Sequence, residues 1–566
     1  MSAKKPIKFI FVSGGVISGL GKGITAASLG MLLKSAGFRV SLTKADMYLN
    51  VDAGTMNPLE HGEVFVTDDG VETDQDLGHY ERFLDENLST RNYFTMGRVY
   101  WDVLQKERSL GYEGKCVEGH VHIPEEIIRK ITLGAEEDQV DISIVEVGGT
   151  VGEYQNMMFF EAIRRLRQRR PGDVVLVHVV YLPIPKFLGE MKSKPAQASV
   201  YELYRLGLQP DFLVCRADEE VDEKRRKTIA FNTGVRYEHI LTNPDVDTIY
   251  RVPIVLEQQE AKEKILKVLG LKNSGGNIKA WKEMLKKMQG LKKEVKIAIV
   301  GKYFTSGNFS LEDSYVCVIE AIKHAAWKSG LKPLIKWFDA EHIDVNELGL
   351  YDGIIVPQGW GSRGVEGKIK VVKFARENKI PYLGLCFGMQ MAVIEFARNV
   401  VGLSEANSEE VDKSAQYPVV HIMPDQEKYL REHKYGGTIR LGAWPCLIKK
   451  GTILEEVYNK FGRTLDKVGI DGGAKEESEK RNVVSERHRH RYEFNNEYRE
   501  ILEKKGLVIS GTSPDGKLVE AVELPKSVHP FFVGTQFHPE YKSRPLSPHP
   551  VFMALIESCI KHQEQG

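Results

Sequence analysis

Cysteine is scarce in this chain of 566 residues, and the few cysteines lie far apart. Only six occur, and no two form a CxxC pair. Zinc ribbons and disulfide scaffolds need closely spaced cysteines, so the sequence argues against both and is typical of a reducing cytoplasm. We expect most of the six to be small buried hydrophobic residues.

Net charge and long apolar runs are also absent. Lysine plus arginine and aspartate plus glutamate both number 78, so no overall field would attract nucleic acid or an anionic membrane. No stretch approaches the roughly 18 to 20 apolar residues that a membrane helix requires. The start, MSAKKPIKFIFVSGG, passes from an apolar run directly into glycines, which favours a buried first strand over a signal peptide.

What the sequence does have is strand–helix alternation in two blocks. In residues 1–270, apolar β-branched runs at 8–13, 141–147, 173–182 and 211–216 alternate with helical patterns such as 26–37 and 159–170. Residues 271–294 interrupt this rhythm with a Ser-Gly-Gly-Asn turn and a lysine-rich helix, which we interpret as a linker. Alternation resumes over 295–566. We therefore predict two doubly wound α/β domains with mostly parallel sheets.

A reactive cysteine is predicted in the second block. The stretch IPYLGLCFGMQ is a strand ending at Leu385, followed by Cys386 and an amphipathic helix from about Met389. A tight strand-to-helix turn exposes its central side chain at a helix N-terminus, where the thiolate is stabilised. A buried structural cysteine is the alternative reading of this stretch alone.

The segment GTQFHPEY supplies partners for that thiol. His538 is a candidate base and Glu540 its orienting carboxylate, since residues two apart share one face of an extended segment. The backbone N–H groups of Gly359, after another strand, and of Phe387 are candidates for the oxyanion hole.

The first block opens with an unusual glycine-rich loop. Glycines 14, 15, 19, 21 and 23 surround Lys22 between a strand and a helix, as in a phosphate cradle. Such loops usually place Ser or Thr after the lysine to bind magnesium, but here Gly23 follows. Asp76 and Glu146 are the carboxylates that we expect to replace this hydroxyl.

The full strings resemble two known families. GLCFGMQ with a distant HPE resembles the triad of class I glutamine amidotransferases. The stretches at 50–83, 192–216, 436–442 and 486–496 are similar to CTP synthases, in the order synthetase then glutaminase. This resemblance implies a P-loop-like synthetase domain and ATP-dependent amination of UTP to CTP, with ammonia from glutamine.

The resemblance also implies roles for individual residues. The ATP set is Ser18, Gly19, Leu20, Gly21, Lys22, Gly23, Lys44 and Arg216, with Mg²⁺ on Asp76 and Glu146. The substrate set is Gly14 beside Ser13, Lys192, Gln197 and Lys227 for UTP, with Gln390, Glu410 and Arg491 around glutamine. His61 is similar to the histidine of the ammonia passage, although a core histidine is the alternative. GTP as activator is expected near Arg363, Glu366, Arg440 and Arg491. A homotetramer, which in this family also forms filaments, is implied.

Departures from the family pattern mark where this chain differs. Its oxyanion turn contains Gln358 where the family usually has glycine, and its 152–156 segment reads GEYQN, which bears on feedback inhibition by CTP. Two alternatives stay open: a cobyrinate-type amidotransferase, which amidates carboxylates, and a nucleotide-binding assembly protein with a decayed site.

Overall fold

The computed structural model describes residues 6–15, 17–302, 305–306, 309–310, 312–431, 436–462 and 483–565. It divides into two compact units. Unit 1 comprises residues 1–53 and 76–285, and unit 2 comprises residues 54–75 and 286–566. Residues 54–75, which we call the inserted segment, thus leave the first unit and pack with the second. The predicted domain boundaries at 270 and 294 remain a prediction.

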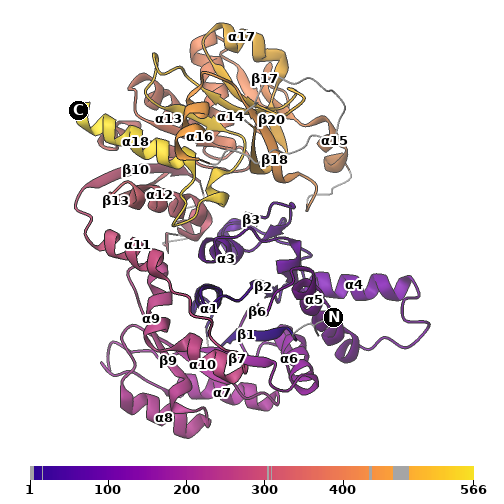
Figure 1. The fold of residues 1–566 in the computed structure, drawn as a ribbon. Helices are drawn as coiled ribbons and strands as arrows, with labels where there is room; N and C mark the ends of the chain where they lie inside the picture. The colour runs from indigo at the N-terminus through magenta and orange to yellow at the C-terminus, as the bar shows by residue number, and fades with distance from the viewer. Residues whose placement is uncertain are drawn as a thin grey trace. The chain divides into compact units, whose positions relative to one another are not determined.

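Unit 1 is built on a seven-stranded sheet in which every neighbouring pair is parallel, in the order β5-β2-β6-β1-β7-β8-β9 (Figure 1). Its strands are β1 (Lys8–Gly14), β2 (Val40–Asp46), β5 (Tyr93–Thr95), β6 (Ile142–Val147), β7 (Val174–Tyr181), β8 (Phe212–Ala217) and β9 (Ile240–Pro244). Its helices are α1 (Lys22–Ser35), α3 (Asp76–Leu84), α4 (Met96–Arg108), α5 (Gly119–Glu137), α6 (Met157–Arg169), α7 (Lys194–Arg205), α8 (Glu223–Thr233), α9 (Val252–Gln258), α10 (Ala261–Val268) and α11 (Lys279–Gln289).

Helices cover both faces of this sheet, as the doubly wound prediction requires. Phe9 and Phe11 of β1 pack into a cluster with α5 and α6, whereas α1 contacts β1, β2 and β6. β1 forms as expected for a first strand. Because all strands point the same way, the loops after β1, β2 and β6 meet at one edge of the sheet.

Unit 2 contains a nine-stranded sheet in the order β13-β10-β14-β15-β23-β22-β21-β18-β19. The first five strands are parallel and the last four are antiparallel. The strands are β10 (Glu294–Gly301), β13 (Lys332–Asp339), β14 (Gly353–Val356), β15 (Tyr382–Leu385), β18 (Arg440–Ile448), β19 (Val483–His490), β21 (Val508–Thr512), β22 (Val519–Glu523) and β23 (Phe532–Thr535). The smaller strands are β3 (Phe65–Val66), β4 (Glu72–Thr73), β11 (Thr305–Ser306), β12 (Phe309–Ser310), β16 (Ala406–Ser408), β17 (Tyr417–Ile422) and β20 (Tyr492–Phe494). The helices are α2 (Pro58–His61), α12 (Val316–Lys328), α13 (Val365–Glu377), α14 (Phe387–Phe396), α15 (Pro424–Arg431), α16 (Ile453–Phe461), α17 (Arg499–Lys504) and α18 (Pro550–Gln565).

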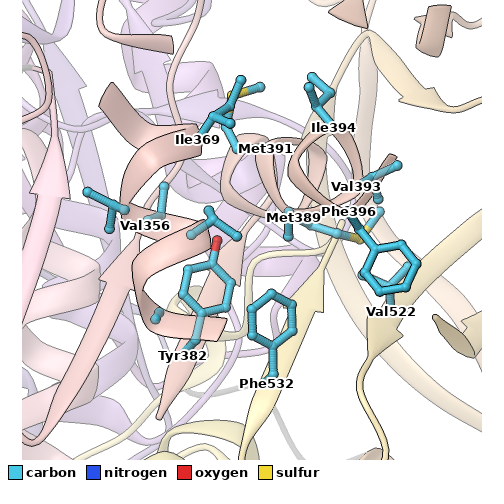
Figure 2. Close-up of a cluster of buried hydrophobic side chains, with 14 of the residues drawn as sticks. Val356, Ile369, Tyr382, Met389, Met391, Val393, Ile394, Phe396, Val522 and Phe532 are labelled. Atoms are coloured by element: carbon cyan, nitrogen blue, oxygen red, sulfur yellow. The ribbon is translucent and has the colours of Figure 1, made fainter. Parts of the chain in front are cut away.

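Helix α14 lies in the middle of the core of unit 2. The sequence predicted an amphipathic helix from about Met389, but α14 begins at Phe387 and all ten of its residues are buried. Figure 2 shows Met389, Met391 and Ile394 with the stacked rings of Tyr382 and Phe532 in one cluster. A helix buried on every side has no polar solvent face, and its polar residues Gln390 and Glu395 bond to the protein instead, so amphipathicity was the wrong expectation.

Within the described residues, no helix is both long enough and apolar enough to cross a membrane.

Candidate active site

Cys386 occupies a strained turn between β15 and α14. Its φ is +51° and its ψ is −100°, a conformation that few residues other than glycine adopt. The turn is possible because Gly388 lets the helix approach β14: a Cβ there would lie 1.9 Å from the carbonyl oxygen of Val356. The predicted elbow is therefore present in this structure, with the thiol at the N-terminus of a helix.

His538 and Glu540 form a buried pair. Nδ1 of His538 lies 2.7 Å from Oε1 of Glu540, and both residues are at most 1 % exposed. The predicted extended segment was wrong, because Pro539 opens a 3₁₀ turn over Pro539–Lys542. Burial by itself lowers the pKa of His538, but Glu540 and Cys386 together raise that pKa to about 10. The imidazole therefore carries a proton at neutral pH.

One pocket brings the predicted residues of this centre together. It is lined by Gly359, Cys386, Phe387, Gln390, Glu410, Arg491 and His538, all expected from the sequence. The pocket thus joins nucleophile, base and oxyanion residues to the polar side chains predicted to hold glutamine.

Sequence reasoning missed Gln536, which lies directly beside the nucleophile. Its Nε2 donates to Cys386 Sγ at 3.4 Å, and its Oε1 accepts from Gln390 Nε2 at 3.2 Å. Gln536 precedes His538 by two residues, and this spacing could have marked it as a residue of the site.

The oxyanion turn, residues 357–361, is held by side chains from several directions. Lys368 Nζ and Tyr315 O–H donate to its first two carbonyl oxygens at 3.1 and 3.3 Å. Lys302 Nζ donates to the last carbonyl oxygen at 2.8 Å, while Glu410 accepts from the last N–H at 2.6 Å. Burial lowers the pKa of Lys302 to about 8 and that of Lys368 well below its usual range. The turn is fixed before any substrate binds.

In unit 1 the glycine-rich loop leads into α1 as predicted. Gly19 and Gly21 have φ values of +72° and +78°, and Gly21 is the N-cap of the helix. Lys22 is the first helical residue, and its Nζ donates to the carbonyl oxygen of Gly149. Burial lowers the pKa of Lys22. The loop presents free helical N–H groups and a lysine at the carboxyl edge of the sheet.

Lys44, Asp76 and Glu146 form a charged cluster at that edge. Lys44 pairs with Glu146 in the register of β2 and β6, and Lys44 Nζ donates to Glu146 Oε1 at 3.0 Å. Lys44 Nζ also contacts Asp76, and the Tyr80 hydroxyl donates to Glu146. Burial raises the pKa of Glu146, whereas for Asp76 the effect of Lys44 outweighs burial and the pKa falls.

Gly23 leaves the space that Asp76 uses. A Cβ at position 23 would lie only 2.3 Å from Oδ1 of Asp76. A serine or threonine here would therefore collide with the carboxylate. The Asp76 carboxylate thus fills the space that a serine or threonine side chain at position 23 would take.

Asp46 is a fourth member of this cluster that sequence reasoning missed. It is the last residue of β2, is buried, and lies 3.8 Å from Lys44 Nζ. Burial raises its pKa to about 6, and among the described residues its Oδ2 has no hydrogen-bond partner. A carboxylate that closes an apolar strand was the available signal, the same one that identified Glu146.

Both halves of the chain match known protein families. Residues 8–271 match the family model of the CTP synthase N-terminus, and residues 310–558 match that of class I glutamine amidotransferases. A CTP synthase of Caldanaerobacter subterraneus is 48 % identical over 98 % of both chains, and one of Sulfolobus acidocaldarius is 46 % identical over 97 % of this chain and 99 % of the other. The chain belongs to the CTP synthase family.

Among solved structures, the glutaminase domain of Trypanosoma brucei CTPS with bound acivicin is 37 % identical. The match between the two structures covers 47 % of this chain and 94 % of that domain, with a TM-score of 0.40.

The residues predicted to bind nucleotide in this CTP synthase family member differ in burial and in their distance from the glycine-rich loop. Arg216 lies next to the loop, 3.9 Å from where a Cβ of Gly21 would stand, and donates to Asp245 and two carbonyl oxygens. Lys192 and Lys227 are solvent-accessible and pair with Glu190 and Glu223. Gln197 is buried at the start of α7.

The residues predicted near GTP also differ in accessibility. Arg363 is half exposed and Glu366 pairs with Arg398. Arg440 is instead buried, with two hydrogen bonds to Glu520. Its guanidinium is thus already engaged by a carboxylate.

The alternating RHRHR stretch faces anions of the chain itself. Arg487 Nε donates to Asp68 at 2.5 Å and Arg489 Nε to Glu72 at 2.9 Å, both acceptors lying in the inserted segment. The stretch is a strand that faces anions, as predicted, but these anions are carboxylates of the protein itself. His61 belongs to the same segment, with Nε2 3.7 Å from Asp74.

Proposed function

We propose that this chain makes CTP from UTP by the reaction of its family. ATP phosphorylates O4 of the uracil ring, and ammonia released from glutamine displaces the phosphate. The observation that carries the glutaminase half is the pocket that Cys386 and His538 line with Gly359 and Phe387, with Glu540 bonded to His538 behind it. The glycine-rich loop with its Lys44–carboxylate cluster supports the kinase half.

The protonated state of His538 determines the order of proton transfers. With a pKa of about 10, the His538 imidazole favours its protonated form and can hold the proton that the thiol gives up as its sulfur attacks. The thiolate adds to the carboxamide carbon, and the N–H groups of Gly359 and Phe387 stabilise the oxyanion. His538 then protonates the departing nitrogen as the C–N bond breaks. Ammonia leaves, and water hydrolyses the thioester to glutamate.

We propose that the carboxylates of the unit 1 cluster, which all contact Lys44, bind a magnesium ion. The donor set is all oxygen, as Mg²⁺ requires, and the unpaired Oδ2 of Asp46 is one such donor. Asp76 and Glu146 would hold the ion, with Asp46 beside them, and bound Mg²⁺ would neutralise charge on the ATP phosphates. Lys22 and Lys44 compensate further phosphate charge. Ser18, Leu20 and the loop glycines would contribute backbone N–H groups.

The remaining assignments follow the family. Lys192, Gln197, Lys227 and the Gly14 region would bind UTP, and Arg216 the ATP. Gln390, Glu410 and Arg491 would bind glutamine, and His61 would line the ammonia passage. GTP would activate the glutaminase near Arg363 and Arg491. A homotetramer would complete the UTP sites, which explains why Lys192 and Lys227 are accessible in the single chain.

One assay tests the proposal. The protein is incubated with ATP, Mg²⁺ and UTP, plus either glutamine or ammonium chloride, and CTP is measured. We expect CTP from both nitrogen donors, and Cys386→Ala should abolish only the glutamine-dependent reaction. Absence of CTP with either donor would refute the proposed function, whereas loss of both activities in a folded Cys386→Ala protein would refute the division of labour.

A further inference from the structure

The inserted segment contacts both halves of the glutaminase centre. On one side, the backbone oxygen of Val64 accepts from the Tyr541 hydroxyl at 3.0 Å, and the ring of Tyr541 stacks against His538 at 4.8 Å. On the other side, the preceding residue, Glu63, reaches the oxyanion turn. Two consecutive residues therefore touch the supports of the base and of the oxyanion hole.

Glu63 is buried, and the hydrogen bonds of its carboxylate include one from a core helix and one from the oxyanion turn. Oε2 accepts from the backbone N–H of Cys317 at 2.6 Å, at the start of α12, and Oε1 accepts from Gln358 Nε2 at 2.7 Å. Glu63 is only 3 % exposed. The carboxylate thus joins the oxyanion turn to the first turn of a core helix.

Gln358 is where this chain departs from the usual glycine of the turn. A buried amide is costly unless it is paired, and Glu63 supplies that pairing. The next residue is Gly359, whose N–H is an oxyanion donor in the proposed mechanism. A constraint on the side chain of Gln358 is therefore a constraint on the peptide that carries this N–H.

We propose that Glu63 is a positioning residue of the glutaminase centre, holding the oxyanion turn in its catalytic conformation through Gln358. The inference rests on the proposed function and deepens it. A residue from the part of the chain that matches the synthetase family model thereby sets the geometry of glutamine hydrolysis. Loss of one oxyanion donor typically lowers kcat by about 10²- to 10³-fold, so partial misplacement should cost about 10- to 100-fold.

A charge exchange tests this pairing. Gln358→Glu places two buried carboxylates together and should lower kcat for glutamine hydrolysis about 30-fold or more, with KM changed less than about 3-fold. The double variant Glu63→Gln/Gln358→Glu restores a donor–acceptor pair, because the new amide donates to the new carboxylate while its oxygen still accepts from Cys317. It should recover most of the lost kcat. Glu63→Gln alone should lower kcat only modestly, since Gln358 can turn its amide oxygen toward the new donor.

Ammonia-dependent CTP synthesis separates this proposal from the proposed function. It should be at the wild-type level in all variants, and its absence in the wild-type protein would refute the function instead. Wild-type glutamine hydrolysis in Gln358→Glu, or no recovery in the double variant, overturns the positioning role. If Gln358→Glu does not fold, Gln358→Met removes the amide without adding charge, and a kcat within about 2-fold of wild type would overturn the proposal equally.

Discussion

Gly23 shows how the absence of a side chain determines which group serves the phosphate site. Its Cβ position lies 2.3 Å from the Asp76 carboxylate, so glycine is required for that carboxylate to reach the loop. The loop therefore exchanges a neutral hydroxyl for a charged oxygen. The exchange explains why Lys44 stands beside the carboxylates, since buried anions need a partner.

Gly23→Ser should displace Asp76 and weaken the response to magnesium. We expect the Mg²⁺ concentration for half-maximal ammonia-dependent CTP synthesis to rise about 10-fold or more. A magnesium titration of that activity is the measurement, with Gly119→Ala, where a Cβ meets open space, as the matched control. Unchanged magnesium dependence in Gly23→Ser would contradict the role given to Asp76, and glutamine hydrolysis should be unaffected.

Glu540→Gln should lower the pKa of His538, because Glu540 is the foremost of the groups that raise it to about 10. A raised folded-state pKa stabilises the protein fully below the ordinary value of about 6.5, and this stabilisation is lost as the pH rises toward 10. The variant should therefore be less stable than wild type by about 2 kcal/mol at pH 6, and the difference should shrink by pH 9.5.

Urea unfolding at the two pH values measures this difference, with the exposed Glu456→Gln as control. If the difference in unfolding free energy between wild type and Glu540→Gln grew from pH 6 to pH 9.5, the predicted pH dependence would be wrong. Glutamine hydrolysis by Glu540→Gln should also fall by about 10²-fold or more.

At the scale of elements, helix α11 shows where the linker belongs. The sequence predicted a lysine-rich helix here, and its residue Trp281 is buried in unit 1. Its Nε1 donates to the carbonyl oxygen of Tyr250 at 2.7 Å, and its ring meets Phe83 and Tyr250 at 5.4 and 5.6 Å. Helix α11 is thus joined to unit 1 through Trp281, and its role as a linker remains a prediction.

Trp281→Ala should therefore destabilise unit 1 by about 3–5 kcal/mol. Trp281→Phe keeps the ring but loses the hydrogen bond, and should cost about 1–2 kcal/mol. Loss of CTP synthesis and of glutamine hydrolysis are followed separately against urea concentration. Only the first midpoint should move; an equal shift of the second would mean that α11 supports unit 2 as well.

Local pattern predicted most elements, the elbow at Cys386 and the loop at Lys22. The metal-binding roles of Asp76 and Glu146 stay predictions, and Asp76 opens helix α3 rather than ending a strand. Local pattern does not show which residues far apart in the sequence form ion pairs. The partners of Arg487 and Arg489 stand more than 400 positions away, so that stretch was interpreted as a binding surface when its anions are internal.

Helix type was also mispredicted where tertiary context decides. All ten residues of helix α14 are buried, including the polar Gln390 and Glu395, which a search for one apolar face does not detect. The 3₁₀ turn after His538 depends on proline at its first position, which suits a helical turn as well as an extended segment.

For the whole molecule, exposed apolar residues bear on assembly. Trp101, Leu104 and Leu110, on α4 and just after it, are 52, 56 and 74 % exposed. Large side chains exposed together are typical of interaction surfaces. They support the proposed homotetramer as a contact between copies of this chain.

Trp101→Glu should therefore shift the protein to smaller species in sedimentation velocity. If the proposed homotetramer completes the UTP sites, ammonia-dependent CTP synthesis should fall about 10-fold or more, while glutamine hydrolysis persists. Lys106→Glu, a charge change on the same helix, is the control. An unaltered sedimentation coefficient for Trp101→Glu would exclude α4 from the interface.

The inserted segment also has a consequence for synthesis on the ribosome. Residues 54–75 emerge early, but their partners Arg487 and Tyr541 are made near the end of the chain. At about 5–20 residues per second, the segment waits tens of seconds with its glutamates and aspartates unpaired. We therefore expect unit 1 to complete its sheet before the inserted segment meets its partners in β19 and in the 3₁₀ turn after His538.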